Sequence, residues 1–177
     1  MAASSQPHDE NDLTGAQRHR SEQRHADRDR TLHAMQQLED VLGTAAPRRE
    51  VAWHAEVRHA LAVLSDAARE EAGNAGQPDS LVSDIARTQP WLRNRVRGLR
   101  IHYRQLIDAI NGLQHELDGA VGEHVDFTDI RQRLSWVLAG LRHQRARESD
   151  LIYEAYYDAF RTDLSTDAAA NESRPRR

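Results

Sequence analysis

Apolar residues recur every three or four positions between about residues 29 and 162, and this spacing most constrains the fold. An α-helix brings such residues onto one face, whereas a half-buried β-strand needs apolar and polar residues to alternate, which no stretch does. Helices with one apolar face each must pack those faces together. The sequence therefore predicts an all-α fold, an up-down-up-down four-helix bundle with a short accessory helix between its second and third helices.

Proline and capping residues indicate where these helices begin. Pro47 suits the first position of the second helix, because a helix leaves the N–H group of that position unpaired. Asp79 or Ser80 can cap the accessory helix, and Asp126 or Thr128 can cap the last one. The expected helices cover residues 27–43, 47–72, 80–88, 90–118 and 126–161.

Both ends of the chain are polar and offer almost nothing to bury. Ordering such segments costs more conformational entropy than burial can return, so we expect residues 1–28 and 163–177 to be disordered, with a helical extension near residue 20 as the one alternative. Residues 29–162 then form the helical domain, and their number is typical of a single domain.

The composition excludes several classes of protein. The 24 basic and 28 acidic residues give a net charge of −4, so we expect no general attraction to nucleic acid or to an anionic membrane. The absence of cysteine excludes disulfides and thiolate metal sites. The start of the chain does not look like a secretory signal, which favours a cytoplasmic protein. A protein partner and the oligomeric state are left open.

Sequence motifs of common enzymes are missing. The chain has no Walker motif, no GxSxG nucleophile elbow and no HExxH zinc motif. We therefore predict no catalytic residue, and a role other than that of an enzyme is favoured.

Several polar residues interrupt the apolar faces and are expected to point inward. A bare inward carboxylate costs several kcal/mol, so each needs a metal ion or a protein donor. Arg145 could neutralise Glu148 or Glu71, and Tyr103 could donate to either, so pairing within the protein is the favoured interpretation. A metal site is the alternative. The inward polar set is Glu39, Glu71, His102, Tyr103, Gln144, Arg145 and Glu148.

The last expected helix contains the sequence ESDLIYEAY at residues 148–156, preceded by LRHQR. Further matching features are LHAM at 32–35, Trp53, PWL at 90–92 and LRIHYRQL at 99–106. In this order the chain resembles the hemerythrin-like (HHE cation-binding) proteins, and in particular a divergent bacterial branch. The resemblance covers most of residues 29–160 and implies a four-helix bundle that holds a non-haem di-iron centre.

Carried over position by position, the resemblance implies a changed ligand set. The histidine of the second helix falls at Glu71, and that of the third falls at Tyr103, beside His102. In the fourth helix, His-x-x-x-Glu becomes Gln144-x-x-x-Glu148. Di-iron chemistry with O₂ requires several imidazoles, so we predict a site that is altered or lost. Glu39, Glu71, His102, Tyr103, Gln144 and Glu148 remain the candidate metal positions, with iron or no cofactor as the alternatives.

Two functions follow from these observations. The first is a hemerythrin-like protein whose ancestral role was binding of iron or O₂, or redox or iron sensing, with an altered or lost metal site. The second is a metal-free helical module for interaction or regulation. Apolar residues outside the inward faces, including Ile101, Trp136 and Tyr157, would favour this second function.

Overall fold

The computed structural model describes the backbone of residues 9–44, 48–119 and 126–172, and within these ranges the side chains of His19 and of residues 21–156. All regular structure in these ranges is helical, which confirms the expected all-α class. The elements are α1 (Asp9–Gly43), α2 (Glu50–Gly76), α3 (Leu81–Thr88), the 3₁₀-helix η1 (Pro90–Leu92), α4 (Arg93–Gly119) and α5 (Phe127–Glu172).

The outer ends of α1 and α5 extend beyond the expected helices. The structure places residues 9–28 and 163–172 in helix, where the composition predicted disorder. Lengthening an existing helix costs little, because each added residue also adds a backbone hydrogen bond. The segment near residue 24 also contacts α2 and α5 through its side chains. The remaining parts of the two predicted tails, 1–8 and 173–177, lie outside the described residues.

The helix starts agree with the sequence at two of three places. Ser80 caps α3, since its Oγ accepts a hydrogen bond from the Ser83 N–H at 3.2 Å. Asp126 caps α5 through its Oδ1 atom, which accepts from the N–H groups of Thr128 and Asp129. The second helix begins at Glu50 instead of Pro47, which lies outside the described residues.

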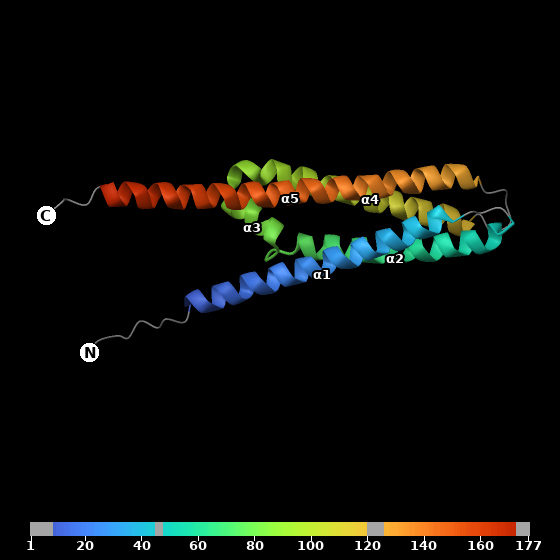
Figure 1. Cartoon of the computed structure of the whole chain (residues 1–177), viewed down its shortest axis with the longest axis horizontal. Coiled ribbons are helices and arrows are strands. Elements are labelled where there is room, and N and C mark those ends of the chain that lie inside the picture. The colour runs from blue at the N-terminus through green and yellow to red at the C-terminus, as the bar shows by residue number, and fades with distance from the viewer. Residues whose placement is uncertain (1–8, 45–47, 120–125, 173–177) are drawn as a thin grey trace.

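The four long helices lie lengthwise beside one another, and α3 sits at one end (Figure 1). Helix α1 packs along α2, α2 packs along α4, and α4 packs along α5. Helix α1 also touches α5, and α3 touches α2, α4 and α5. These contacts bring together the apolar faces that the spacing of the sequence predicted.

The buried apolar residues form two clusters along the long axis. The larger cluster joins α1, α2, α4 and α5 and includes Met35, Leu38, Trp53, Leu64, Ile110 and Leu134. The smaller cluster joins α3, η1, α4 and α5 and consists of Val82, Ile85, Leu92, Val96, Leu99, Leu151 and Ala155. The two clusters leave a gap in the apolar core near the middle of α5.

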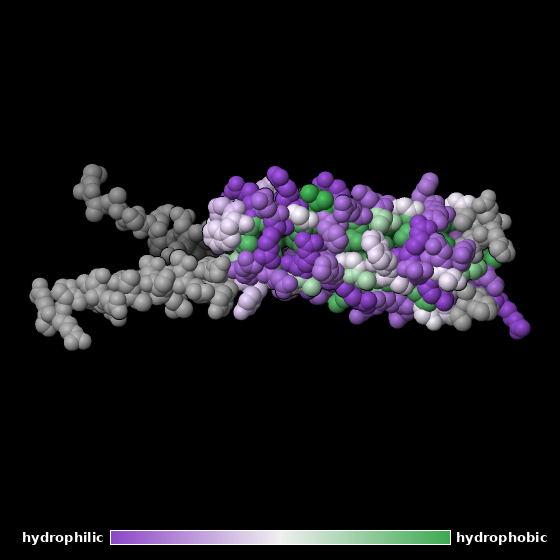
Figure 2. All heavy atoms as spheres, turned by 90° about the horizontal axis from the view of Figure 1, so that it is seen from above, coloured by the Kyte–Doolittle hydropathy of each residue, from purple (hydrophilic) through white to green (hydrophobic). Residues whose placement is uncertain are grey.

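The face seen in Figure 2 is mainly hydrophilic over the described residues, with apolar residues scattered over it. Ile101 and Trp136 are exposed, as the sequence predicted, whereas the side chain of Tyr157 is outside those described. Within the described residues, no helix has both the length and the apolar character needed to cross a membrane.

Candidate functional site

A layer of polar side chains separates the two apolar clusters. On α4, the smaller cluster ends at Leu99 and the larger one begins at Leu106. On α5, the larger cluster ends at Leu141 and the smaller one begins at Leu151. Between them, the side chains that point inward are polar and reach hydrogen-bond partners on neighbouring helices. This polar layer comprises Arg24, Asp27, Glu71, Asn74, His102, Tyr103, Gln144, Arg145 and Glu148.

Glu71 of α2 lies at the centre of the layer. Its Oε2 atom accepts a hydrogen bond from the Tyr103 hydroxyl at 3.0 Å and faces the Arg145 guanidinium at 3.5 Å. The side chains of Arg145 and Glu71 are only 10% and 12% exposed, so the pair is largely desolvated. Arg145 also donates to the backbone oxygen of Arg28 at 2.7 Å. The structure thus brings together Tyr103, Glu71 and Arg145, as the sequence suggested.

The phenol of Tyr103 is held in its neutral form. Burial first, and then the nearby negative charge of Glu71, raise the pKa of Tyr103 far above its ordinary value. To bind a metal ion as a phenolate, Tyr103 would have to lose the proton that it donates to Glu71. Forming that charge is costly in this low-dielectric position.

This raised pKa predicts a loss of stability in alkali. The unfolded chain releases the Tyr103 proton above about pH 10, while the folded chain keeps it, so stability is unaffected below that pH and falls above it. We expect a decline of about 1.4 kcal/mol per pH unit that Tyr103→Phe abolishes. The chain contains no lysine, so few other groups titrate in this range. Urea unfolding at a series of pH values measures the slope; equal slopes in both proteins would contradict it.

Glu148 of α5 has a different cationic partner from the one expected. Its Oε1 atom accepts from Arg24 Nε at 3.0 Å, and the two side chains are 15% and 20% exposed. Arg24 lies in the part of α1 that the sequence predicted to be disordered. Arg145, the other candidate partner, is engaged with Glu71 instead.

We expect Glu148→Gln to be tolerated, with a loss of about 1 kcal/mol in unfolding free energy, because the amide oxygen can still accept from Arg24. Thermal or urea unfolding with and without a chelator measures this. Glu154, on the same helix as Glu148, forms a more exposed ion pair with Arg95 of α4, so Glu154→Gln is the matched control. A much larger loss that depends on the chelator would show instead that Glu148 binds a cation.

His102 and Gln144 form a second pair in the layer. Gln144, which is 4% exposed, donates from Nε2 to the backbone oxygen of Leu99 at 3.0 Å. Its Oε1 therefore faces His102, whose Nδ1 lies 2.8 Å away and donates the proton. The His102 ring and the Gln144 amide are thus hydrogen-bonded to each other.

Glu39 lies apart from the polar layer. Its side chain is 33% exposed and forms an ion pair with Arg142 of α5. The structure therefore separates Glu39 from the other candidate metal positions, although all were expected to point inward.

Asp27 and Asn74 are members of the layer that the sequence analysis missed. Asp27 is 4% exposed, and its carboxylate accepts from Asn74 Nδ2 at 2.8 Å and from Gln23 Nε2 at 3.3 Å. A signal was present, because Asp27 and Thr31 continue the three- and four-residue spacing of the apolar face of α1.

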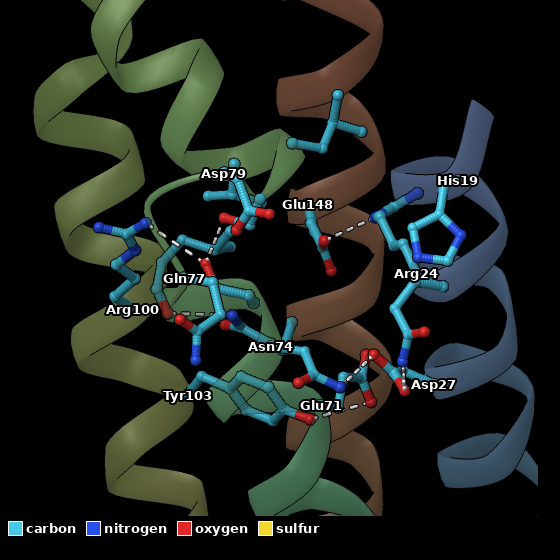
Figure 3. A pocket seen from close by; sticks show the side chains of 17 residues that line it. His19, Arg24, Asp27, Glu71, Asn74, Gln77, Asp79, Arg100, Tyr103 and Glu148 are labelled. Carbon is cyan, nitrogen blue, oxygen red and sulfur yellow. Dashed lines mark hydrogen bonds and ion pairs between the residues drawn. The ribbon is translucent and has the colours of Figure 1, made fainter. Parts of the chain in front are cut away.

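A cavity of about 280 Å³ adjoins the polar layer (Figure 3). Its walls come from α1, α2, α3, α4, α5 and the connection between α2 and α3. Ala75, Leu81, Val82 and Leu99 supply apolar surface. Charged groups are also present, and Figure 3 shows Glu148 and Arg24 on one side and Arg100 on the other. Such a mixture of apolar walls and a few polar groups is typical of small-molecule sites.

The candidate metal positions do not converge on one point. Among the residues with described side chains, no three or more His, Asp or Glu groups are placed to hold a metal ion together. Comparison with protein-family models gave no match, and no similar curated protein or solved structure was found.

Proposed function

We propose that this chain is a hemerythrin-like, up-down-up-down four-helix bundle that acts in the cytoplasm as a metal-free regulatory module, responding to a small molecule bound in the cavity. The observation that carries the proposal is the position of the cavity. It adjoins the polar layer and takes residues from all four long helices and from α3. A ligand there would contact every helix and could change how they pack.

Internal ion pairs support the metal-free form. Glu71 faces Arg145, and Glu148 faces Arg24, so both of these inward carboxylates are already neutralised by the protein. A divalent ion would have to displace two guanidinium groups and remove the proton of Tyr103. This donor set does not fit a di-iron centre, which needs several free imidazoles and bridging carboxylates.

The metal-binding alternative keeps one supporting feature, since Glu71 and Glu148 both line the same cavity. Production of the full chain in iron-supplemented cells, followed by elemental analysis and a near-ultraviolet spectrum, separates the two functions. We expect no stoichiometric iron and no iron charge-transfer absorption. Stoichiometric iron would overturn the metal-free proposal.

The role of the cavity is tested by filling it. Ala75 lies in the cavity wall on α2, so Ala75→Phe should occupy the space where a ligand would bind. Ala52→Phe on the exposed part of the same helix is the matched control. A thermal-shift screen of small organic molecules should give stabilising compounds for the wild type and the control but not for Ala75→Phe. Compounds that stabilise all three equally would show that the cavity is not the binding site.

A further inference from the structure

Arg100 of α4 is a cation in the cavity wall that lacks a counter-ion. Its Nη2 atom donates to Ser83 Oγ at 2.7 Å and to the backbone oxygen of Ala75 at 3.3 Å, both of which are uncharged. Its Nε atom is buried and has no hydrogen-bond partner. Among the side chains that the structure describes, Arg100 forms no ion pair. A partly buried guanidinium of this kind retains unused hydrogen-bond donors and a positive charge.

The inward acidic groups of the cavity are, in contrast, already compensated. Glu148 is paired with Arg24, and Glu71 with Arg145 and Tyr103. Asp27 lies 3.8 Å from Arg30 Nη1 and also accepts from the amide groups of Asn74 and Gln23. Asp79, the remaining carboxylate in the wall, is exposed, and water can solvate it. Among the described side chains, Arg100 is therefore the charged group of the cavity wall that is shielded from water and has no oppositely charged partner.

From this balance, we propose that the cavity binds a small monocarboxylate with an apolar body and that Arg100 holds the carboxylate; this rests on the proposed function of the cavity as a ligand site. A guanidinium group matches the planar geometry of a carboxylate and can form two charge-assisted hydrogen bonds with it. The apolar body would pack against Ala75, Leu81 and Leu99.

A single negative charge suits the cavity better than several. Asp79 also lines it without an ion pair among the described side chains, and its carboxylate would repel a second negative charge on the ligand. Inorganic phosphate and dicarboxylates are therefore disfavoured. The first turn of α3 adds a favourable partial charge, since Leu81 and Val82 of that turn also lie in the wall.

Isothermal titration calorimetry of the full chain with benzoate and benzylamine tests the sign of the charge, because these probes share a ring and differ in charge. We expect benzoate to bind at least about tenfold more tightly than benzylamine or inorganic phosphate. Tighter binding of benzylamine or of phosphate would overturn the proposal.

Substitutions of Arg100 then test whether this residue holds the carboxylate. Arg100→Gln should weaken benzoate binding at least about tenfold, whereas Arg100→Lys, which keeps the charge, should retain most of it. Arg97→Gln, at an exposed position of the same helix, is the matched control and should have no effect. Asp79→Asn should strengthen binding, because it removes a repelling charge. Unchanged affinity in Arg100→Gln would contradict the assignment.

Ala75→Phe keeps the test valid if Arg100→Gln does not fold. It leaves Arg100 in place and should abolish benzoate binding by filling the cavity. The outcomes also separate the two proposals. If benzylamine binds and Ala75→Phe prevents it, the cavity is a ligand site and only the monocarboxylate inference fails. If Ala75→Phe leaves the binding of every probe unchanged, both fail.

Discussion

Arg145→Met is expected to lower the free energy of unfolding by about 3–5 kcal/mol, because it leaves the buried Glu71 carboxylate without its cation. Arg145 and Glu71 are nearly buried, and Tyr103 alone would then face the carboxylate. Methionine replaces the unbranched aliphatic part of arginine and lacks the guanidinium group, so the loss reports on the guanidinium more than on packing of the stem. Urea unfolding followed by circular dichroism, with and without a chelator, gives the measurement.

Two further variants make this expectation specific. Arg142 lies on the same helix as Arg145 and forms a more exposed ion pair with Glu39 of α1. Arg142→Met removes this pair and should cost less than about 1 kcal/mol. Glu71→Gln, combined with Arg145→Met, should recover part of the loss, because a neutral amide can still accept from Tyr103. If Arg145→Met were as stable as the wild type, and the wild type lost stability with the chelator, a bound cation would be indicated instead.

Helical spacing was sufficient to predict the all-α class and the accessory helix, because apolar residues determine which faces are buried. It failed at the start of α1, where the buried positions are polar. Asp27 and Thr31 are 4% and 0% exposed, yet a count of apolar residues treats both as surface. Their burial depends on partners such as Asn74, which lies far away in the sequence. Apolar spacing therefore predicted a helix at these residues, from 27 to 43, but could not predict that Asp27 and Thr31 are buried in it.

The polar layer was predicted in part for a related reason. Rotation along each helix correctly placed Glu71, Gln144 and Arg145 inward, but rotation does not specify which helix each side chain meets. That depends on the register between helices, which packing determines. Arg145 therefore meets Glu71, whereas Glu148 meets Arg24 from the segment assigned to a disordered tail. The sequence could therefore predict that inward carboxylates pair with cationic side chains, but not which arginine each carboxylate meets.

Trp53→Ala is the second substitution with a large expected effect, and it acts at the opposite end of the core from the cavity. Trp53 is 1% exposed, and its Nε1 atom donates to the backbone oxygen of Val41 at 3.1 Å. Its ring meets Phe127 edge-on, with 5.2 Å between the centroids, and the Arg131 guanidinium lies 5.4 Å from it. Removing this ring should leave a void and cost about 3–5 kcal/mol.

Urea unfolding followed by circular dichroism measures this loss, because both Trp53 variants keep only the exposed Trp91 and Trp136 and so have no buried tryptophan to report unfolding. Trp53→Phe retains most of the ring but loses the hydrogen bond to Val41, so a smaller loss of about 1–2 kcal/mol is expected. A loss below about 1 kcal/mol in Trp53→Ala would mean that the ring is not packed as the structure shows. Because Trp53 does not line the cavity, folded Trp53→Phe should bind benzoate with wild-type affinity. Weakened binding in that variant would show instead that the two ends of the core are coupled.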